Sequence, residues 1–223
     1  MDIRTYLQDN ILLFDGAMGT YLSTMASGDF VELANLSDPD QVERVHREYI
    51  AAGAKAIKTN TFAANSATLD RYTLAEVLKR GWELAEKAAG RDAWVFADLG
   101  PLPRQIPDPA AEFTALADQF LDLGAKHFLF ETLPDLDGVR EAAGHIKARC
   151  PEAFVLVSIT AQPDGFTRTG LPAREMLRLA EASEAIDAAG LNCLTSAGHM
   201  GQLVELVGLG EKPFSAMPNA GYP

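Results

Sequence analysis

The feature that most constrains the fold is a regular alternation of short β-type runs with longer amphipathic stretches. Seven runs are rich in β-branched and aromatic residues, at positions 11–15, 56–60, 94–98, 127–131, 154–160, 189–193 and 213–219. Stretches with helical spacing lie between them, at 38–53, 74–90, 109–125, 136–150 and 172–190. Strands and helices that alternate in this way predict parallel βα units, each helix returning the chain to start the next strand.

Parallel βα units form either an open doubly wound sheet or a (β/α)8 barrel. An open sheet that binds a dinucleotide carries G-x-G-x-x-G after its first strand. Here the corresponding string, DGAMGT, has only Gly16 and Gly19, and it places Asp15 where phosphates need neutral backbone donors. We therefore predict an α/β fold of the TIM-barrel type, (β/α)8 but truncated to about seven strands, with residues 1–223 as one domain.

Each predicted strand ends on a polar residue or a cysteine. In a barrel of parallel strands, these carboxyl ends converge on one face, where the active site is built. Polar residues are also common in ordinary turns, so a single position of this kind indicates little. The whole set predicts a functional site at the barrel mouth, and its members are Asp15, Asn60, Asp98, Glu131, Thr160, Cys193 and Asn219.

Charge and hydropathy exclude several classes of partner. The chain has 19 Lys and Arg against 31 Asp and Glu, a formal net charge of -12, and no basic run. Nucleic-acid binding needs clustered cations, so we expect no nucleic-acid partner. No apolar stretch approaches the roughly 18 residues of a membrane span, and the first residues do not resemble a signal peptide. We therefore expect a cytoplasmic protein without a membrane partner.

Several strings, taken in order, resemble the homocysteine S-methyltransferase family, which includes the homocysteine-binding domain of cobalamin-dependent methionine synthase. The likeness covers nearly the whole chain. It consists of FDGAMGT after the first predicted strand, KTNTF at the second, DLGP at the third, ETLPDL at the fourth, and then DGFTRTG, GLNC and MPNAGYP. The last string is most similar to the bacterial methionine synthase branch.

The resemblance implies a substrate and residues that hold it. Homocysteine is a zwitterion with a thiol, so its site needs carboxylates for the ammonium and a group that favours the thiolate. By resemblance, Asp15 and Glu131 hold the ammonium, and Asn192 fixes the backbone next to Cys193. Further residues that shape the pocket are Gly16, Thr59 and Asn60.

The resemblance also implies zinc, which this chain supplies with ligands only in part. In the family, the cysteine that corresponds to Cys193 binds Zn2+ with two adjacent cysteines of a later GGCC string, and the metal activates the homocysteine sulfur. The sequence has only two cysteines and no such string. Cys150 is predicted at a helix end, far from the mouth, which leaves Asn219 or His199 as further candidate ligands beside Cys193.

Three explanations of the incomplete pattern stay open. The sequence is a fragment of a longer enzyme, it is a short homologue without zinc chemistry, or another chain supplies the last βα unit. A barrel of seven strands leaves unpaired backbone at its first and last strands, which invites a covering segment. We therefore expect something to cover this gap, and a homodimer is one candidate.

Three functions follow from these observations. The first is methyl transfer to homocysteine thiolate, which gives methionine; because the chain has no D-x-H-x-x-G cobalamin motif, a corrinoid donor would arrive on a partner. The second is a regulatory or binding protein that keeps the amino-acid pocket without catalysis. The third, a Schiff-base aldolase, would use Lys58, the only lysine on a predicted strand, and the surrounding KTNTF string argues against it.

Overall fold

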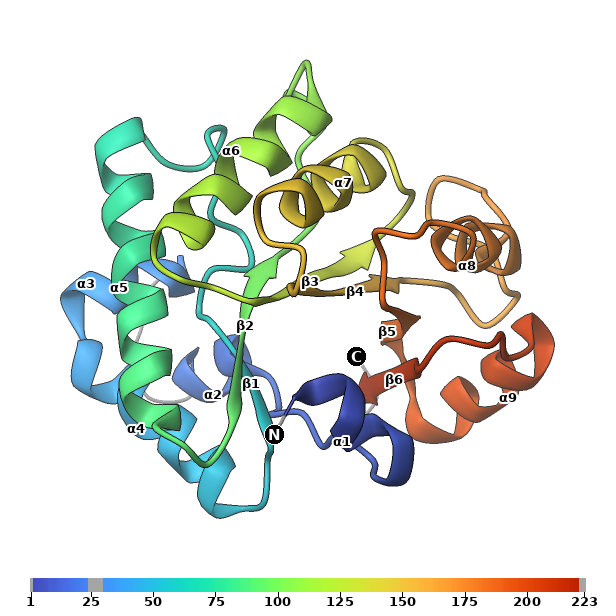
Figure 1. The fold of residues 1–223 in the computed structure, drawn as a ribbon, viewed down its shortest axis with the longest axis horizontal. Coiled ribbons are helices and arrows are strands. Elements are labelled where there is room, and N and C mark those ends of the chain that lie inside the picture. The colour runs from blue at the N-terminus through green and yellow to red at the C-terminus, as the bar shows by residue number, and fades with distance from the viewer. Residues whose placement is uncertain (1, 24–29, 221–223) are drawn as a thin grey trace.

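The computed structural model describes residues 2–23 and 30–220 of the chain. Within these residues, six parallel strands form one sheet in sequence order, and Figure 1 shows the sheet curving from β1 round to β6 as an open half-barrel. The strands are β1 (Ala56–Lys58), β2 (Trp94–Leu99), β3 (His127–Leu133), β4 (Phe154–Ile159), β5 (Ala188–Ser196) and β6 (Phe214–Asn219). The predicted α/β fold of the TIM-barrel type is confirmed.

Helices cover the convex side of the sheet (Figure 1). The longer ones are α4 (Pro39–Ala51), α5 (Arg71–Ala89), α6 (Pro109–Asp122), α7 (Val139–Arg149), α8 (Ala173–Glu181) and α9 (Ala197–Val207). Shorter elements precede them, namely α1 (Ile3–Asp9), α2 (Met18–Ser23), the 3-10 turn η1 (Val31–Leu33) and α3 (Ala34–Ser37).

Local sequence explains where several helices begin. The Asp70 carboxylate accepts hydrogen bonds from the backbone N–H groups of Tyr72 and Thr73, and so caps α5. Asp108 caps α6 in the same way, through Ala111 N–H. In α4 and α6 proline occupies the first turn, where its missing N–H costs no helical hydrogen bond.

The sheet has a different core on each side. On the convex side, strand residues such as Val95, Phe128 and Val157 pack with the buried faces of the helices. On the concave side a smaller cluster fills the barrel interior, with Phe96 and Leu129 among its fully buried members. Because side chains alternate along a strand, the residues two positions beyond this inner cluster face the barrel mouth.

Helix α1 closes the base of the half-barrel. Ile3 is buried in the inner cluster and Leu7 packs against it. Arg4 donates to the Asp187 carboxylate at 2.7 Å, just before β5, and to the backbone carbonyl oxygen of Ala153, just before β4. Figure 1 shows α1 between β1 and β6, so the chain itself covers this end of the opening.

Of the predicted strands, about seven, six form in the described part of the chain, and the run at 11–15 does not form a regular strand. Residues 11–15 pair with β1 only through an isolated parallel bridge between Phe14 and Ala56. The Leu13 carbonyl oxygen accepts from two successive N–H groups, those of Lys55 and Ala56, which interrupts a regular ladder. Ile11 is 90% exposed, so the apolar run does not mark a buried strand throughout.

Other boundaries also differ from the predicted ones. The helix predicted at 172–190 ends at Glu181, and two turns follow it before β5: Ser183 N–H donates to the Ala180 carbonyl oxygen, and Ile186 N–H to that of Ser183. Strand β5 continues past Cys193 to Ser196, and β3 continues past Glu131 to Leu133. Helices α1 and α9 lie outside the predicted helical stretches.

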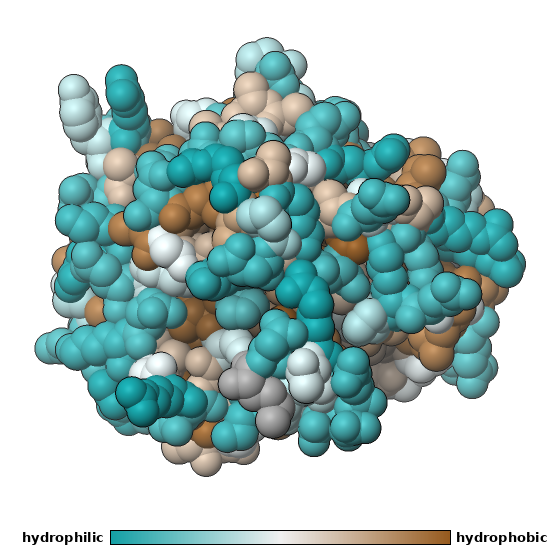
Figure 2. All heavy atoms as spheres, viewed as in Figure 1, coloured by the Kyte–Doolittle hydropathy of each residue, from teal (hydrophilic) through white to brown (hydrophobic). Residues whose placement is uncertain are grey.

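The face of the molecule seen in Figure 2 is largely polar. Figure 2 shows mainly hydrophilic side chains over the face in view, with smaller hydrophobic areas between them. None of the helices in the described part of the chain has the length and apolarity that a membrane span requires.

Candidate functional site

A polar layer lies at the carboxyl ends of the strands, on the barrel side. Ala56, Phe96, Leu129 and Leu156 belong to the apolar interior. The residues two positions further along these strands face the same way and are all polar. They are Lys58, Asp98, Glu131 and Ser158.

Asp15 enters this layer from the segment beside β1. Its Oδ2 accepts a hydrogen bond from the Lys58 backbone N–H at 3.0 Å, whereas its buried Oδ1 has no partner among the described residues. Burial, reinforced by Glu131 and partly offset by Lys58, raises the pKa of Asp15 to about 7. The carboxyl group therefore changes protonation near neutral pH and keeps one oxygen available to a donor.

Lys58 and Glu131 form an ion pair inside the mouth. Lys58 Nζ lies 3.4 Å from Glu131 Oε2, and their side chains are 16% and 8% exposed. Burial by itself would lower the pKa of Lys58, but the carboxylates of Glu131, Asp15 and Asp98 together raise it above its usual value. Lys58 is thus held as an ammonium, which is the wrong state for a Schiff-base nucleophile.

Asp98 is the most deeply buried acid of the layer. It is 3% exposed, and its Oδ1 has no partner among the described residues. Burial, and then the charge of Glu131, raises its pKa well above the usual range. The hydroxyls of Ser158 on β4 and of Thr160, directly after this strand, are also buried without a described partner. An unpaired buried polar group is costly, so these atoms mark a place suited to a polar ligand.

Asn192 links Glu131 to Cys193. Its Nδ2 donates to Glu131 Oε2 at 3.3 Å and to Thr132 Oγ1 at 2.8 Å, and lies 3.5 Å from Cys193 Sγ. Its Oδ1 accepts from Thr132 N–H at 2.9 Å. Burial, ahead of the smaller effects of neighbouring groups, raises the pKa of Cys193. Asn192 is predicted to fix the backbone beside Cys193, and its contacts also reach the carboxylate of Glu131.

Two adjacent irregularities shape this part of the mouth. The strand register shifts between Phe130 and Leu133 in β3 and between Asn192 and Ser196 in β5. Within them, Thr132, Cys193 and Leu194 have φ values of 60°, 58° and 56°. Such left-handed conformations cost non-glycine residues about 1 to 3 kcal/mol each and concentrate at functional sites. The bulges bring Thr132 and Cys193 together.

Three predicted pocket residues have mainly structural contacts. Asn60 donates from Nδ2 to Val31 O and to Asn35 Oδ1, which ties the loop after β1 to η1 and α3. Thr59 Oγ1 accepts from Asp98 N–H at 3.0 Å and so holds β2. At Gly16, a Cβ atom would lie 2.6 Å from the Tyr49 hydroxyl oxygen, so this position needs glycine for close packing.

The remaining candidates do not assemble a metal site. Cys150 ends α7, and His199 lies in the first turn of α9 with Nδ1 3.3 Å from Ser196 Oγ. Asn219 ends β6, opposite Ser196 of β5. Across residues 2–23 and 30–220, no three His, Cys, Asp or Glu side chains are grouped so as to hold a metal ion. Zinc normally needs at least three protein ligands, so the described residues do not fit the implied zinc.

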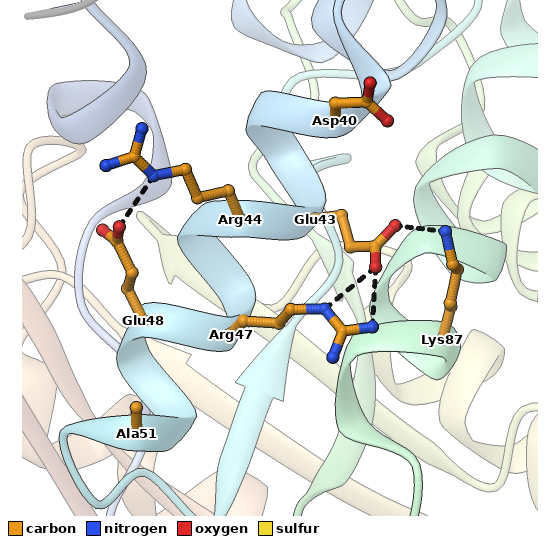
Figure 3. A pocket seen from close by; sticks show the side chains of 7 residues that line it. All are labelled: Asp40, Glu43, Arg44, Arg47, Glu48, Ala51 and Lys87. Atoms are coloured by element: carbon orange, nitrogen blue, oxygen red, sulfur yellow. Dashed lines mark hydrogen bonds and ion pairs between the residues drawn. The ribbon is translucent and has the colours of Figure 1, made fainter.

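A separate hollow on the outside of the helices has a simpler explanation. Figure 3 shows that its charged side chains point mainly toward one another: Glu43 accepts from Arg47 and Lys87, and Glu48 accepts from Arg44. These pairs lie on the solvent side of α4 and α5, whereas the polar layer lies inside the barrel. The cations of these pairs are exposed, although the Glu43 side chain is only 12% exposed, and ion pairs at a protein surface contribute little individually.

Sequence reasoning overlooked part of the layer. All three residues lie in strings that carry the family resemblance, but the predictions give Thr132 no role, treat Lys58 only as a Schiff-base candidate and treat Asp98 only as a polar strand end. The alternation of side chains along a strand could have indicated that Lys58 and Asp98 face the barrel mouth. Each lies two residues after an apolar residue of the barrel interior, Ala56 and Phe96 respectively. The ETLPDL string includes Thr132 but gives it no role, because the position of its side chain depends on a bulge.

The chain matches one family model over most of its length. Residues 12–223 match the model described as Homocysteine S-methyltransferase. Against curated proteins, the chain is 30% identical over 252 residues to methionine synthase from Mycobacterium tuberculosis, with 100% of this chain and 21% of the relative covered. It is 26% identical over 248 residues to homocysteine S-methyltransferase from Escherichia coli, with 96% and 79% covered. The chain thus spans about a fifth of the length of the methionine synthase that it matches.

Solved structures support the same relationship. The apo form of the homocysteine methyltransferase MmuM from Escherichia coli superposes with a TM-score of 0.79 at 28% identity, covering 98% of this chain and 86% of that one. The metallated form gives a TM-score of 0.80 at 24% identity, with 98% and 87% covered. The recognised strings, the half-barrel and the family match agree, and the chain belongs to the homocysteine S-methyltransferase family.

Proposed function

We propose that this chain binds homocysteine in the mouth of its half-barrel, as the acceptor pocket for S-methyl transfer that yields methionine. The observation that carries the proposal is the coexistence of unpaired acid oxygens and a thiol in one mouth. Asp15 Oδ1 and Asp98 Oδ1 are buried without described partners, and Cys193 is linked to the same layer through Asn192.

The acids suit the ammonium of an amino acid. A carboxylate that accepts from an ammonium in a sheltered site forms a strong, charge-assisted hydrogen bond. In the proposed complex, Asp15 and Glu131 receive the ammonium, and binding a cation favours the ionised form of Asp15. The thiol end of the ligand then extends toward Cys193.

The proposal requires a methyl donor and a metal that the described residues do not supply by themselves. The metallated form of MmuM supports metal chemistry in a relative, but the described residues of this chain supply one thiol in the mouth, that of Cys193, and no three-ligand group. Additional donors, such as an adjoining segment or a second copy, would have to complete a zinc site. A corrinoid donor would likewise arrive on a partner.

The single thiol favours a second candidate function, a homocysteine-binding protein without catalysis. Three measurements on the 223-residue chain separate the candidates: calorimetry with homocysteine, methionine formation from homocysteine and methylcobalamin, and zinc content by mass spectrometry. Binding with zinc and methionine formation supports the transferase. Binding without either supports the binding protein.

The Asp15→Asn variant tests the pocket itself. We expect it to weaken homocysteine binding at least tenfold, whereas Asp9→Asn, at an exposed position in α1, leaves binding unchanged. If the native chain binds no homocysteine at millimolar concentration, with or without added zinc, both candidates are wrong.

A further inference from the structure

Lys58 occupies the place that a substrate ammonium would need. It ends β1 on the barrel side, and its Nζ lies 3.4 Å from Glu131 Oε2. The same Oε2 accepts from Asn192 Nδ2 at 3.3 Å. An incoming ammonium that uses this oxygen therefore meets a hydrogen-bond acceptor that is already engaged.

The two cations are chemically equivalent. The lysine side chain and the α-amino group of an amino acid are both primary ammonium groups with three N–H donors. Glu131, Asp15 and Asp98 all act on the charge of Lys58, and Asp15 and Glu131 are the acids proposed to hold the ligand. One internal ammonium already satisfies part of the acid layer.

The opposite role, in which Lys58 binds the substrate carboxylate, fits the surroundings less well. A carboxylate placed beside Lys58 would also lie among the acids that surround it, and like charges in a sheltered site repel strongly. Lys58 is also a compact charge that pairs with one oxygen, whereas arginine provides the bidentate fork that commonly anchors carboxylates.

We infer that Lys58 is a tethered competitor, whose ammonium must leave Glu131 before the ammonium of the ligand can bind there. The inference rests on the proposed function and adds a residue that sets affinity and specificity. It makes the pocket bind amino acids more weakly than its acids alone would, and it makes the displacement depend on the amino group of the ligand.

Calorimetry with two thiols on four proteins tests this role. The thiols are homocysteine and 4-mercaptobutyrate, which lacks only the amino group. The proteins are the native chain, Lys58→Met, Lys58→Arg and the control Lys55→Met, which removes an exposed positive charge at the other end of β1. We expect Lys58→Met to bind homocysteine at least tenfold more tightly and 4-mercaptobutyrate as the native chain does, while the other two variants resemble the native chain.

The remaining outcomes are distinct. Weaker binding of both thiols by Lys58→Met would assign Lys58 to the carboxylate and overturn the inference. Unchanged homocysteine binding by Lys58→Met, where the native chain binds, overturns the inference alone. If neither protein binds homocysteine, the proposed function fails as well.

A measurement on the native chain covers the case in which Lys58→Met does not fold. The lysine Nζ nuclei, labelled with nitrogen-15, report whether the Lys58 ammonium leaves its carboxylate. Homocysteine is expected to shift the Lys58 signal, and 4-mercaptobutyrate to leave it in place. Equal shifts, or no shift under saturating homocysteine, contradict the competitor role.

Discussion

Thr132 and Cys193 lie on strands that are not neighbours in the sheet, yet Thr132 Oγ1 is 3.6 Å from Cys193 Sγ. Both residues have left-handed backbone conformations, with φ values of 60° and 58°. Strand β4, which separates β3 from β5, ends at Ile159, and the two bulges approach each other beyond that point. The candidate thiol is therefore positioned by backbone strain as well as by side-chain contacts.

Leu194 offers a way to measure this strain without changing the thiol. Its φ of 56° is unfavourable for any residue with a Cβ, by about 1 to 2 kcal/mol, whereas glycine adopts it freely. We expect Leu194→Gly to be about 1 kcal/mol more stable than Leu194→Ala in urea unfolding. Within a regular strand, a glycine variant is normally less stable than the alanine variant. If Leu194→Gly is less stable than Leu194→Ala, the backbone at this bulge is not strained.

The Asp15 carboxyl group is expected to make stability fall as pH rises. Its pKa is about 7 in the folded protein against an ordinary 3.8, so the folded state favours the protonated form. This contribution is complete below about pH 4 and is lost by about pH 7, with an upper limit of roughly 4 kcal/mol. The free energy of unfolding of the native chain relative to Asp15→Asn should decrease over that interval.

The exposed Asp9→Asn variant is the matched control for this titration. A decrease for Asp15→Asn that Asp9→Asn does not share would assign the effect to the buried carboxyl group. A flat profile for Asp15→Asn would mean that Asp15 ionises normally in the folded protein.

His46 is expected to act in the opposite direction. It is fully buried in α4, and neither ring nitrogen has a partner among the described residues. Burial lowers its pKa to about 4, from an ordinary 6.5, so the neutral ring stabilises the fold only while the pH stays high. As the pH falls from 6.5 to 4, the native chain should lose up to roughly 3 kcal/mol relative to His46→Leu.

Denaturant unfolding of the native chain and of His46→Leu at several pH values in this range measures that loss. A difference that does not change on acidification would require a polar partner for the imidazolium.

Gly16 is predicted to be required by packing against Tyr49. A Cβ atom at this position would lie 2.6 Å from the tyrosine Oη and 2.7 Å from Cε1, which is closer than carbon atoms approach without displacement. We expect Gly16→Ala to cost about 1 to 3 kcal/mol of stability, as overpacking does. In a Tyr49→Leu background, the same substitution should cost clearly less; equal costs in both backgrounds would place the effect in the backbone.

The sequence could predict which residues reach the mouth better than what they contact there. Glu131 and Cys193 stand near strand ends in a repeating pattern, and the repeat alone places them on one face of the fold. Pairing depends on distances across the barrel: nothing local to Lys58 indicates that its ammonium reaches Glu131, 73 positions away.

The errors in the fold have similar causes. Residues 11–15 have the composition of a strand, but the two hydrogen bonds to the Leu13 carbonyl oxygen leave only one bridge. The continuation of β5 beyond Cys193 depends on two residues in left-handed conformations, Cys193 and Leu194. Neither is a glycine or an asparagine, the residue types that usually indicate such a conformation in a sequence. The pattern of polar and apolar residues in the sequence indicates neither of these two features.

The closure of the barrel base by α1 also constrains how the chain folds. Arg4 must find Asp187, 183 positions later, so the first helix cannot reach its final place until β5 has emerged and formed. Contacts between such distant positions slow folding, because a long loop must close before they stabilise anything. The apolar face of α1 therefore remains exposed until most of the chain has been synthesised. The docking of this helix is expected among the last steps of folding.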